Sequence, residues 1–302
     1  MLAGAHLIVL AAAAALPAFA GEKPLCRGQG ASYSPDGKGL LLERVIDHRH
    51  RIAILDRDRR KVTWVYRGPG QACQPAWGPD GSVVFTAGHE TKTAFAASAE
   101  GVDTGYNLYV WRTGVVRQVT FGRIRAYSAS FAPDGRRIYF ATEAVRPDHG
   151  STDVYSNNRT GLAVVPVSDG GPFERVAVMS DSNTGMSDPE VSPDGRDLLR
   201  CEVSGYGFPW QVVVSPLASP DEKRFLTGRD MIACEPTWSP DGRTVAFAAC
   251  GPQDDGWQVY FVRPDGTGLR RIAAGNNPAF SPDGRLLAYD RDGVVYEREV
   301  DE

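Results

Sequence analysis

Six small or polar residues stand at equivalent places along the chain, each five residues before a proline that opens a recurring turn. They are Gly30, Gln74, Ser128, Asp188, Glu235 and Asn277. Five of them are polar although their neighbours are apolar, and their oxygen atoms suit a divalent cation or a polar ligand in a central channel. Only two are carboxylates and calcium prefers more, so a water-filled channel with solvated side chains is the open alternative.

Histidine is the second residue type that could do chemistry, and four copies follow residue 20. His48 and His50 stand two apart at the tip of a predicted hairpin, which fits either a metal site or a charged tip. His89 and His149 fall in two long predicted loops. The chain has no H-E-x-x-H or P-loop motif. It also has no G-x-S-x-G elbow, which argues against a peptidase of the propeller-plus-hydrolase type.

The elements that position these residues follow from a turn of the type Ser-Pro-Asp-Gly, which occurs six times. Its aspartates are Asp36, Asp80, Asp134, Asp194, Asp241 and Asp283, spaced by 44, 54, 60, 47 and 42 residues. Proline pre-sets φ for the second position of a type I turn, Asp suits the third, and Gly supplies a positive φ at the fourth. A period of this length indicates stacked supersecondary units.

Each turn joins two expected strands, as in EPTW and TVAFAA on either side of the turn at 239–242. The first strand of each unit alternates, and the second is apolar enough to be buried on both faces. Two further strands follow, as in WQVYFV and GLRRIA within residues 257–273. Four antiparallel strands per unit, repeated six times, predict an all-β fold, a six-bladed β-propeller of four-stranded antiparallel blades.

The last unit, residues 276–302, stops after its third strand and would leave a sheet edge unpaired. The segment GEKPLCRGQ, residues 21–29, lies just before the first repeat. We expect this N-terminal segment to pair with the last blade and close the ring, the alternative being a frayed tail and an open blade. The propeller is then expected to span residues 21–302, without a second domain.

Residues 1–20 have the features of a secretory signal peptide. An apolar run from Leu7 to Leu16 leads to Ala18-Phe19-Ala20, a small-x-small cleavage pattern before Gly21. No Lys or Arg precedes the run, so a buried helix or a membrane anchor is the alternative. An anchor needs about 20 apolar residues, and Pro17 interrupts this run early. We expect a periplasmic or secreted chain with no membrane span after cleavage.

The pattern P-x-W-S-P-D-G-R, followed by WQVYFVRPDGTGLRRI, resembles the TolB-type propeller family of bacterial envelope proteins. The resemblance covers nearly all of residues 21–302, and the endings DGTGLRRI and RQVTFG make it more specific than the turn alone. It implies a binding protein of the cell envelope. One departure matters: TolB carries a separate α/β domain before its propeller, and no such domain is expected here. Partner contacts made through that domain therefore cannot be carried over.

The turns and the long loops are expected at opposite ends of the propeller, because the turns join strands one and two of every unit. Insertions between strands two and three concentrate at residues 88–106, 143–161, 204–210 and 250–257. Variable loops on a rigid ring are a common binding surface, and aromatic residues often anchor protein interfaces. The predicted interaction face comprises Phe95, Tyr106, Tyr155, Tyr206, Phe208, Trp210 and Trp257. The alternative for each is that it only caps a blade.

The five cysteines have no zinc-site spacing, and an exported chain could oxidise them. Cys234 and Cys250 flank one turn and are expected to be near neighbours, and a bond between Cys26 and Cys73 would lock the closing segment. The alternative is that these four remain reduced core thiols. The disulfide state, including that of Cys201, stays open at this point.

Two functions fit this sequence. Net charge is −4 and no long basic run occurs, so nucleic acid is an unsuitable partner. The first function is an exported, non-catalytic scaffold that binds an envelope protein or peptide on its loop face. The second is a carbohydrate-active enzyme, because propeller lyases that act on acidic sugars use histidine and metal on this face. Its site would combine His89 and His149 with Asp188 and Glu235.

Overall fold

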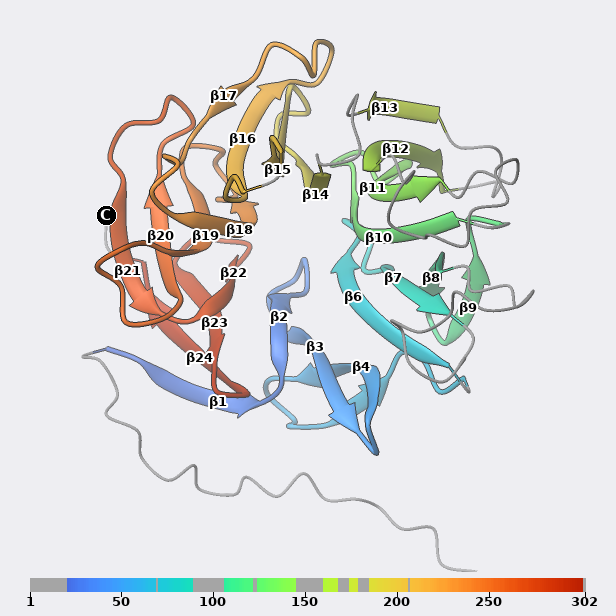
Figure 1. Ribbon diagram of the computed structural model, residues 1–302. Coiled ribbons are helices and arrows are strands. Elements are labelled where there is room, and N and C mark those ends of the chain that lie inside the picture. The colour runs from blue at the N-terminus through green and yellow to red at the C-terminus, as the bar shows by residue number, and fades with distance from the viewer. Residues whose placement is uncertain are drawn as a thin grey trace, which may run out of the picture.

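The computed structural model describes residues 21–68, 70–88, 106–121, 124–144, 160–167, 174–178, 185–205 and 207–300. The predicted signal peptide, residues 1–20, lies outside these ranges. The described residues form strands β1 to β24 and no helix, so they contain no helix that could span a membrane. The strands build antiparallel sheets arranged radially about one axis (Figure 1). The predicted all-β propeller architecture is therefore confirmed.

Four of the sheets are separate and have four strands each. The first contains β2 (Gln29–Tyr33), β3 (Gly39–Ile46), β4 (Arg49–Asp56) and β5 (Val62–Trp64). Another contains β14 (Gly185–Val191), β15 (Asp197–Val203), β16 (Gln211–Pro216) and β17 (Arg224–Phe225). The next contains β18 (Ile232–Trp238), β19 (Val245–Cys250), β20 (Gln258–Val262) and β21 (Arg270–Ala274). The last contains β22 (Asn276–Phe280), β23 (Leu286–Arg291), β24 (Val294–Glu299) and β1 (Lys23–Arg27).

The remaining sheet has eight strands where the repeats predict two sheets of four. One half contains β6 (Gln71–Trp77), β7 (Val83–Gly88), β8 (Tyr106–Arg112) and β9 (Val115–Gln118). The other half contains β10 (Ile124–Phe131), β11 (Arg137–Ala144), β12 (Thr160–Pro166) and β13 (Glu174–Val178). A parallel pairing between Arg125 and Tyr106 joins the halves. Six separate sheets are therefore not observed, because this pairing fuses two repeats into one hydrogen-bonded sheet.

The recurring turn has the geometry that its residue types predict. At the turn of β18 and β19, the Ser239 hydroxyl donates to Asp241 Oδ1 at 2.6 Å, and the same oxygen accepts the Arg243 N–H at 3.0 Å. Gly242 has a φ of 69°, a conformation that suits a residue without a side chain. The hydrogen bond from Ser239 is the main cause that lowers the pKa of the Asp241 carboxyl. The repeated aspartate thus has a structural role within its own turn.

The N-terminal segment pairs with the last repeat, as predicted. Strand β1 lies beside β24 (Figure 1). The two strands are antiparallel, with Lys23 opposite Glu297 and Arg27 opposite Val294. Just before β1, Glu22 accepts hydrogen bonds from the Tyr289 hydroxyl and from Arg291, the latter at 3.0 Å. The edge of β24 that the sequence left unpaired is therefore covered.

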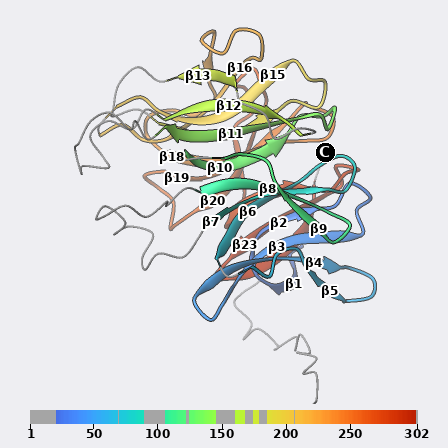
Figure 2. The ribbon, with the colours of Figure 1, turned by 90° about the vertical axis from the view of Figure 1, so that its right-hand side faces the viewer.

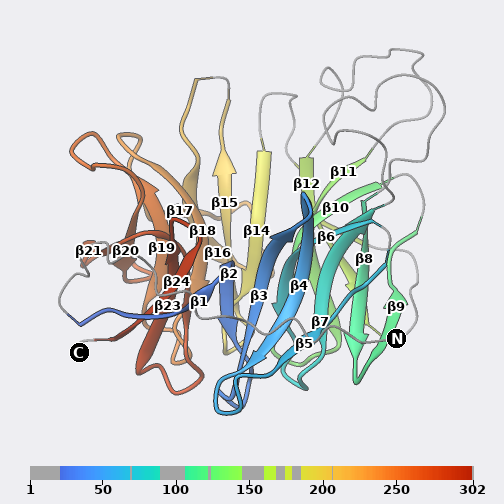
Figure 3. The same ribbon diagram turned by 90° about the horizontal axis from the view of Figure 1, so that it is seen from below.

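The core lies between neighbouring sheets, where the second strand of each repeat is buried on both faces. Leu41, Phe85 and Phe247 are fully buried. They lie on the strands β3, β7 and β19, which are labelled in Figure 2 and Figure 3. Such strands pack against a sheet on either side, which is why they read as continuous apolar runs. One buried pair departs from this rule, since β15 carries Arg200 and Glu202, which are bonded to each other at 2.7 Å.

Candidate functional site

The six residues that the turn spacing singled out occupy one conformation. All have a left-handed backbone, with φ of 58° at Gly30 and between 48° and 55° at the five others. Each lies in a β-bulge of the first strand of its repeat, where the pairing with the second strand slips. These first strands, β2, β6, β10, β14, β18 and β22, surround the axis (Figure 1). We call the six residues the inner ring.

The bulges turn the backbone N–H groups of the inner ring toward the neighbouring repeat. The N–H of Asn277 donates to Glu235 Oε2 at 2.7 Å, and that of Ser128 donates to Gln74 Oε1 at 3.1 Å. Gln74 Nε2 also lies 3.3 Å from Ser128 Oγ. In these two pairs, the side chain of one ring member accepts a hydrogen bond from the backbone N–H of the next member. Non-glycine residues rarely adopt this conformation, and such residues cluster at functional sites.

Two further carboxylates belong to this site, and the turn spacing alone did not identify them. Glu43 Oε2 accepts the Gln74 N–H at 2.9 Å, and Asp290 Oδ2 accepts the Gly30 N–H at 2.8 Å. Asp290 also accepts from Asn277 Nδ2 at 2.9 Å. Both carboxylates are nearly buried, with 8% and 6% of their surface exposed.

A sequence signal for Glu43 and Asp290 exists in the second strand of each repeat. The residue before each inner-ring member pairs with one second-strand position. That position holds Glu43, Thr86, Ala141, Cys201, Ala248 and Asp290. A carboxylate at a place where the other repeats carry small, less polar side chains marks a buried polar group that needs a partner. An alignment of the six repeats on their turns therefore singles out both carboxylates.

Burial and like charge shape the electrostatics of the ring. Burial is the main cause that raises the pKa of Glu235 to about 7; the Asn277 N–H opposes this shift, and the charges of Asp188 and Asp290 contribute to it. Burial also raises the pKa of Asp290, with Glu43 contributing and the hydrogen bonds from Gly30 and Asn277 opposing. A carboxyl that titrates near neutral pH is suited to proton exchange or to receiving a cation. The acidic groups are thus electrostatically coupled across four repeats.

The structure gives no direct support for a metal at this site. No group of three or more His, Cys, Asp or Glu residues that could hold a metal ion occurs within the described ranges. His48 and His50, predicted to lie together at a hairpin tip, have different surroundings. His50 Nδ1 is hydrogen-bonded to Glu43, whereas His48 lies in the hairpin turn with a φ of 60°. His89 and His149 lie outside the described residues.

The predicted interaction face is only partly described. Phe208 and Trp257 are exposed at the loop end, with 44% and 37% of their surface accessible, and Ile232 joins them with 47%. The Arg229 guanidinium lies 4.6 Å from the centre of the Phe208 ring. Phe95, Tyr155 and Tyr206 lie outside the described residues. Three exposed apolar side chains are thus present at this end of the sheets formed by β14–β17 and β18–β21.

Trp210 and Tyr106, two further residues of the predicted interaction face, are less exposed than Phe208 and Trp257. Both are half-buried, and Trp210 packs against the buried cluster between the sheets of β14–β17 and β18–β21. A Cβ added to Gly185 would lie 2.9 Å from the Trp210 ring, so this glycine makes room for the indole. Tyr106 begins β8 and pairs with Gly88 and Arg125. The packing of Trp210 fits the capping alternative, and for Tyr106 both interpretations stay open.

All five cysteines are free. Cys234 pairs with Ala248, and Cys250 pairs with Ile232, so the two thiols are diagonal neighbours on β18 and β19 without a bond. Cys26 lies on β1 and Cys73 on β6, in different sheets. Burial raises the pKa of Cys26 to about 11 and that of Cys73 to about 12. These thiols are therefore poor nucleophiles.

Comparison with known proteins supports the family resemblance. No model of a known protein family matches the chain. A TolB homolog from Chlorobium luteolum is 28% identical over 175 residues, which is 55% of this chain and 36% of that protein. The crystal structure of TolB from Acinetobacter baumannii superposes with a TM-score of 0.60 at 18% identity, over 90% of this chain and 63% of that one. This chain therefore spans about a third of the first protein and under two thirds of the second.

A similar fold is also found in an enzyme. Oligogalacturonate lyase in complex with manganese superposes with a TM-score of 0.60 at 12% identity, over 93% of each chain. Identity at this level shows a shared propeller fold and does not transfer an activity. The fold alone therefore does not distinguish a binding protein from an enzyme, and the argument for either function must come from the residues of the site.

Proposed function

Starting from a TolB-like β-propeller, we propose that the chain is an exported, periplasmic scaffold that binds an envelope protein or peptide without catalysis. In this proposal residues 1–20 are a signal peptide and residues 21–302 are the propeller. The eight-stranded sheet counts as two blades, because its halves follow two separate turn repeats and meet at the Arg125–Tyr106 pairing. The blade number is then six, with the N-terminal strand closing the last blade.

The observation that carries the binding proposal is the exposure of Phe208, Ile232 and Trp257 at one end of the propeller. Ile232 begins β18, Trp257 directly precedes β20, and Phe208 lies three residues before β16. Large apolar side chains anchored this close to a sheet lose little conformational entropy when a partner covers them. Most of the inner-ring contacts are hydrogen bonds between repeats, so the ring mainly fixes the spacing of the sheets beneath this surface. Asp188 and Glu235 could additionally receive a basic side chain or a hydrated cation from the partner side.

The enzyme remains the second candidate because of one observation. Burial raises the pKa of Glu235 to about 7, and the charge of Asp188 contributes to this shift. A carboxyl whose pKa is raised in this way beside a second carboxylate is typical of active sites. An active site of this type needs His89 and His149 to converge on the pair. Incubation of the purified chain with oligogalacturonate and manganese tests it directly. Turnover that is lost in Glu235→Gln would favour the enzyme over the scaffold.

The scaffold is tested by capture of envelope proteins with matched surface variants. Phe208→Ala and Trp257→Ala should each reduce recovery of a specific partner by about tenfold, which corresponds to roughly 1.4 kcal/mol of binding energy. Phe225→Ala is the control, because Phe225 is similarly exposed but lies on the outer strand β17. Equal recovery by all three variants would contradict the proposal. N-terminal sequencing of periplasmic protein should give Gly21 as the first residue.

A further inference from the structure

The first sheet differs in charge from the rest of the chain. Residues 22–67, which form β1 and the sheet β2–β5, contain eleven Lys and Arg but six Asp and Glu. This positive surplus occurs in a chain whose net charge is −4. A charge asymmetry of this kind produces a local positive potential that attracts anionic partners. The sheet β2–β5 is therefore the part of the propeller best suited to meet an anionic surface.

The hairpin of β3 and β4 carries two exposed aliphatic side chains near its tip, which lies at the outer margin of the ring (Figure 1). Val45 has 57% of its surface exposed and Ile46 has 37%. Asp47 and His48 form the turn, and both have a positive φ, 50° and 60°. A positive φ at both central residues is typical of the type I′ turn, which keeps the strands paired up to the turn. The two aliphatic side chains thus stand at the end of an ordered hairpin.

Arginines surround the two aliphatic residues. In the pairing of β3 with β4, Arg49 lies opposite Ile46, and Arg44 lies directly opposite Arg51. Like charges in directly opposed positions destabilise an antiparallel pair. A negative surface close to this end of the hairpin would therefore relieve repulsion as well as attract the arginines.

A fourth arginine reaches the same place from the segment that leads into the next sheet. Arg67 is exposed, and the carbonyl of the following residue accepts a hydrogen bond from Arg51 Nη1 at 3.2 Å. Asp47 in the turn is exposed and offsets one of these charges. Arg27 and Asp292 lie beside the hairpin at the seam with the last sheet, where they offset each other. We call the hairpin end with its positive surplus the basic tip, which comprises Arg44, Val45, Ile46, Arg49, Arg51 and Arg67.

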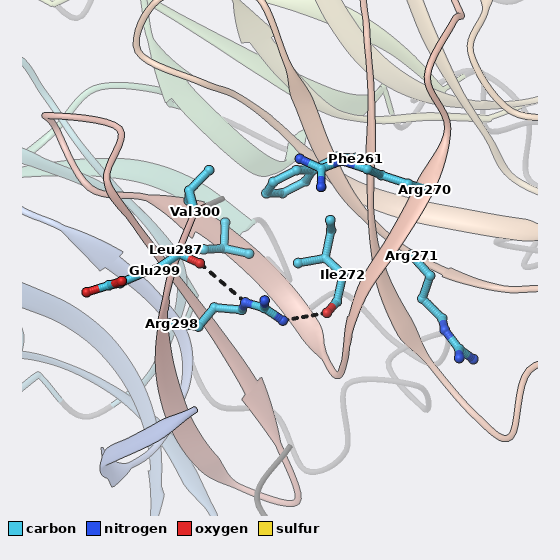
Figure 4. A pocket seen from close by; sticks show the side chains of 8 residues that line it. All are labelled: Phe261, Arg270, Arg271, Ile272, Leu287, Arg298, Glu299 and Val300. Carbon is cyan, nitrogen blue, oxygen red and sulfur yellow. Dashed lines mark hydrogen bonds between the residues drawn. The ribbon is translucent and has the colours of Figure 1, made fainter. Parts of the chain in front are cut away.

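The pocket between the sheets of β18–β21 and β22–β1 is also lined by arginines, but these have internal roles (Figure 4). Arg298 donates to the Ile272 carbonyl at 2.6 Å and to the Glu299 carbonyl at 3.4 Å. The Arg270 guanidinium lies 5.5 Å from the centre of the Phe261 ring. These contacts lie within the fold, so the pocket gives no reason to expect a ligand.

We propose that the basic tip docks the propeller on an anionic lipid surface. Val45 and Ile46 enter the boundary between head groups and acyl chains, and the arginines bind the lipid phosphates. A dissolved anion would leave both aliphatic side chains in water, whereas a lipid surface removes them from it. Attraction and shallow insertion then act together, as reversible membrane binding requires. The proposal does not rest on the scaffold function, because Phe208, Ile232 and Trp257 belong to other sheets.

Co-sedimentation with vesicles tests the docking on the chain that starts at Gly21, because the apolar run Leu7–Leu16 would itself bind lipid. Vesicles of equal parts phosphatidylglycerol and phosphatidylcholine should bind the protein more tightly than phosphatidylcholine alone, by about fivefold or more. The difference should shrink at about 1 M salt, where the Debye length is about 3 Å. Equal binding to both kinds of vesicle at low salt, or no binding, would overturn the proposal.

Two charge variants connect the binding to the basic tip. Arg44→Gln/Arg49→Gln should weaken binding to the mixed vesicles about fivefold or more. Arg59→Gln/Lys61→Gln removes the same charge from exposed residues at the other end of β4 and should leave binding unchanged. An eight-residue strand spans about 26 Å, beyond the Debye length of about 10 Å at 0.1 M salt. Equal losses in both variants would show that overall charge acts and would reject the tip.

A charge-neutral change distinguishes a lipid surface from an acidic polypeptide. Val45→Ser/Ile46→Ser keeps every charge and should weaken vesicle binding severalfold, because the apolar contribution is lost. Arg44→Lys/Arg49→Lys should retain vesicle binding, which separates loss of charge from a folding defect in the glutamine variant. Polyglutamate is the polypeptide probe. Polyglutamate bound as tightly as the mixed vesicles, together with unchanged vesicle binding by the serine variant, would assign the tip to an acidic polypeptide and overturn the lipid proposal.

Discussion

The backbone N–H of Gly30 donates to Asp290 Oδ2 at 2.8 Å, joining two residues that are 260 positions apart. This bond crosses the seam where the last repeat meets the first. Two further bonds cross the same seam, because Glu297 accepts from the Tyr33 hydroxyl at 2.7 Å and from Arg57. The ring is thus closed by buried polar contacts in addition to the pairing of β1 with β24.

Asp290→Ala should destabilise the propeller more than loss of an exposed aspartate. The change leaves the Gly30 N–H and Asn277 Nδ2 without their common acceptor in a nearly buried place. Each unsatisfied buried donor costs about 1–3 kcal/mol, so we expect a loss of about 2–4 kcal/mol. Urea unfolding measures it, with Asp255→Ala as the exposed control. A loss equal to that of the control would show that the seam bonds contribute nothing.

Removal of β1 should open the closing sheet. A chain that starts at Gly28 loses the pairing with β24 and the contacts of Glu22 with Tyr289 and Arg291. The uncovered β24 edge should lower the unfolding midpoint and promote association. Light scattering and urea unfolding of the two chain lengths measure both effects. An unchanged midpoint together with a monomeric shortened chain would contradict closure by this strand.

Much of the fold can be predicted from local sequence patterns. The Ser-Pro-Asp-Gly turn fixes where strand one ends and strand two begins, because its side-chain hydrogen bonds are internal, as between Ser281 and Asp283 at 2.6 Å. The second strand of each repeat can be predicted from its composition, because a strand buried on both faces is a continuous apolar run. The turn spacing also placed the six inner-ring residues at equivalent positions, and the structure gives all six one backbone conformation.

What the sequence could not predict depends on contacts between repeats. The left-handed conformation of Glu235 and Asp188 arises from bulges, which depend on packing against the next sheet. Nothing in the local sequence around Trp210 predicts that its ring lies over Gly185. The fusion of two repeats through Arg125 and Tyr106 likewise has no signal in either segment.

Stability should fall as pH rises from about 5 to 8, partly through Glu235. Its folded pKa of about 7 lies above the usual value of 4.5, so the folded state favours the protonated carboxyl. That stabilisation is fully present below pH 4.5 and is lost as pH rises through 7. Glu235→Gln should reduce this pH dependence, whereas Glu222→Gln, an exposed control, should not. Thermal melts between pH 5 and 8 test it, and identical slopes in all three proteins would refute the assignment.

The strain of the inner ring can be measured at Ser128. Its φ of 48° suits glycine and disfavours β-branched residues. Ser128→Gly should be within about 1 kcal/mol of the wild type, while Ser128→Val should cost at least about 1–3 kcal/mol. Denaturant unfolding of the pair compares them at one site. Equal stability of the glycine and valine variants would mean that the backbone relaxes out of the left-handed region.

The buried pair Arg200–Glu202 gives the most demanding test of how the propeller tolerates charge. Arg200 donates to Glu202 Oε1 at 2.7 Å, to Ser215 Oγ at 2.6 Å and to the Pro220 carbonyl at 2.8 Å. Arg200→Met leaves the fully buried Glu202 carboxylate paired with Lys223 but without Arg200, and removal of one partner of a buried pair costs about 3–5 kcal/mol.

The double variant Arg200→Met/Glu202→Leu should recover most of this loss, because no buried charge is left and Lys223 reaches solvent with 30% of its side chain exposed. A double-mutant cycle in urea isolates the coupling between the two residues. A double variant as unstable as Arg200→Met alone would mean that the bonds to Ser215 and Pro220, and not the charge pair, hold the segment that leads into β17.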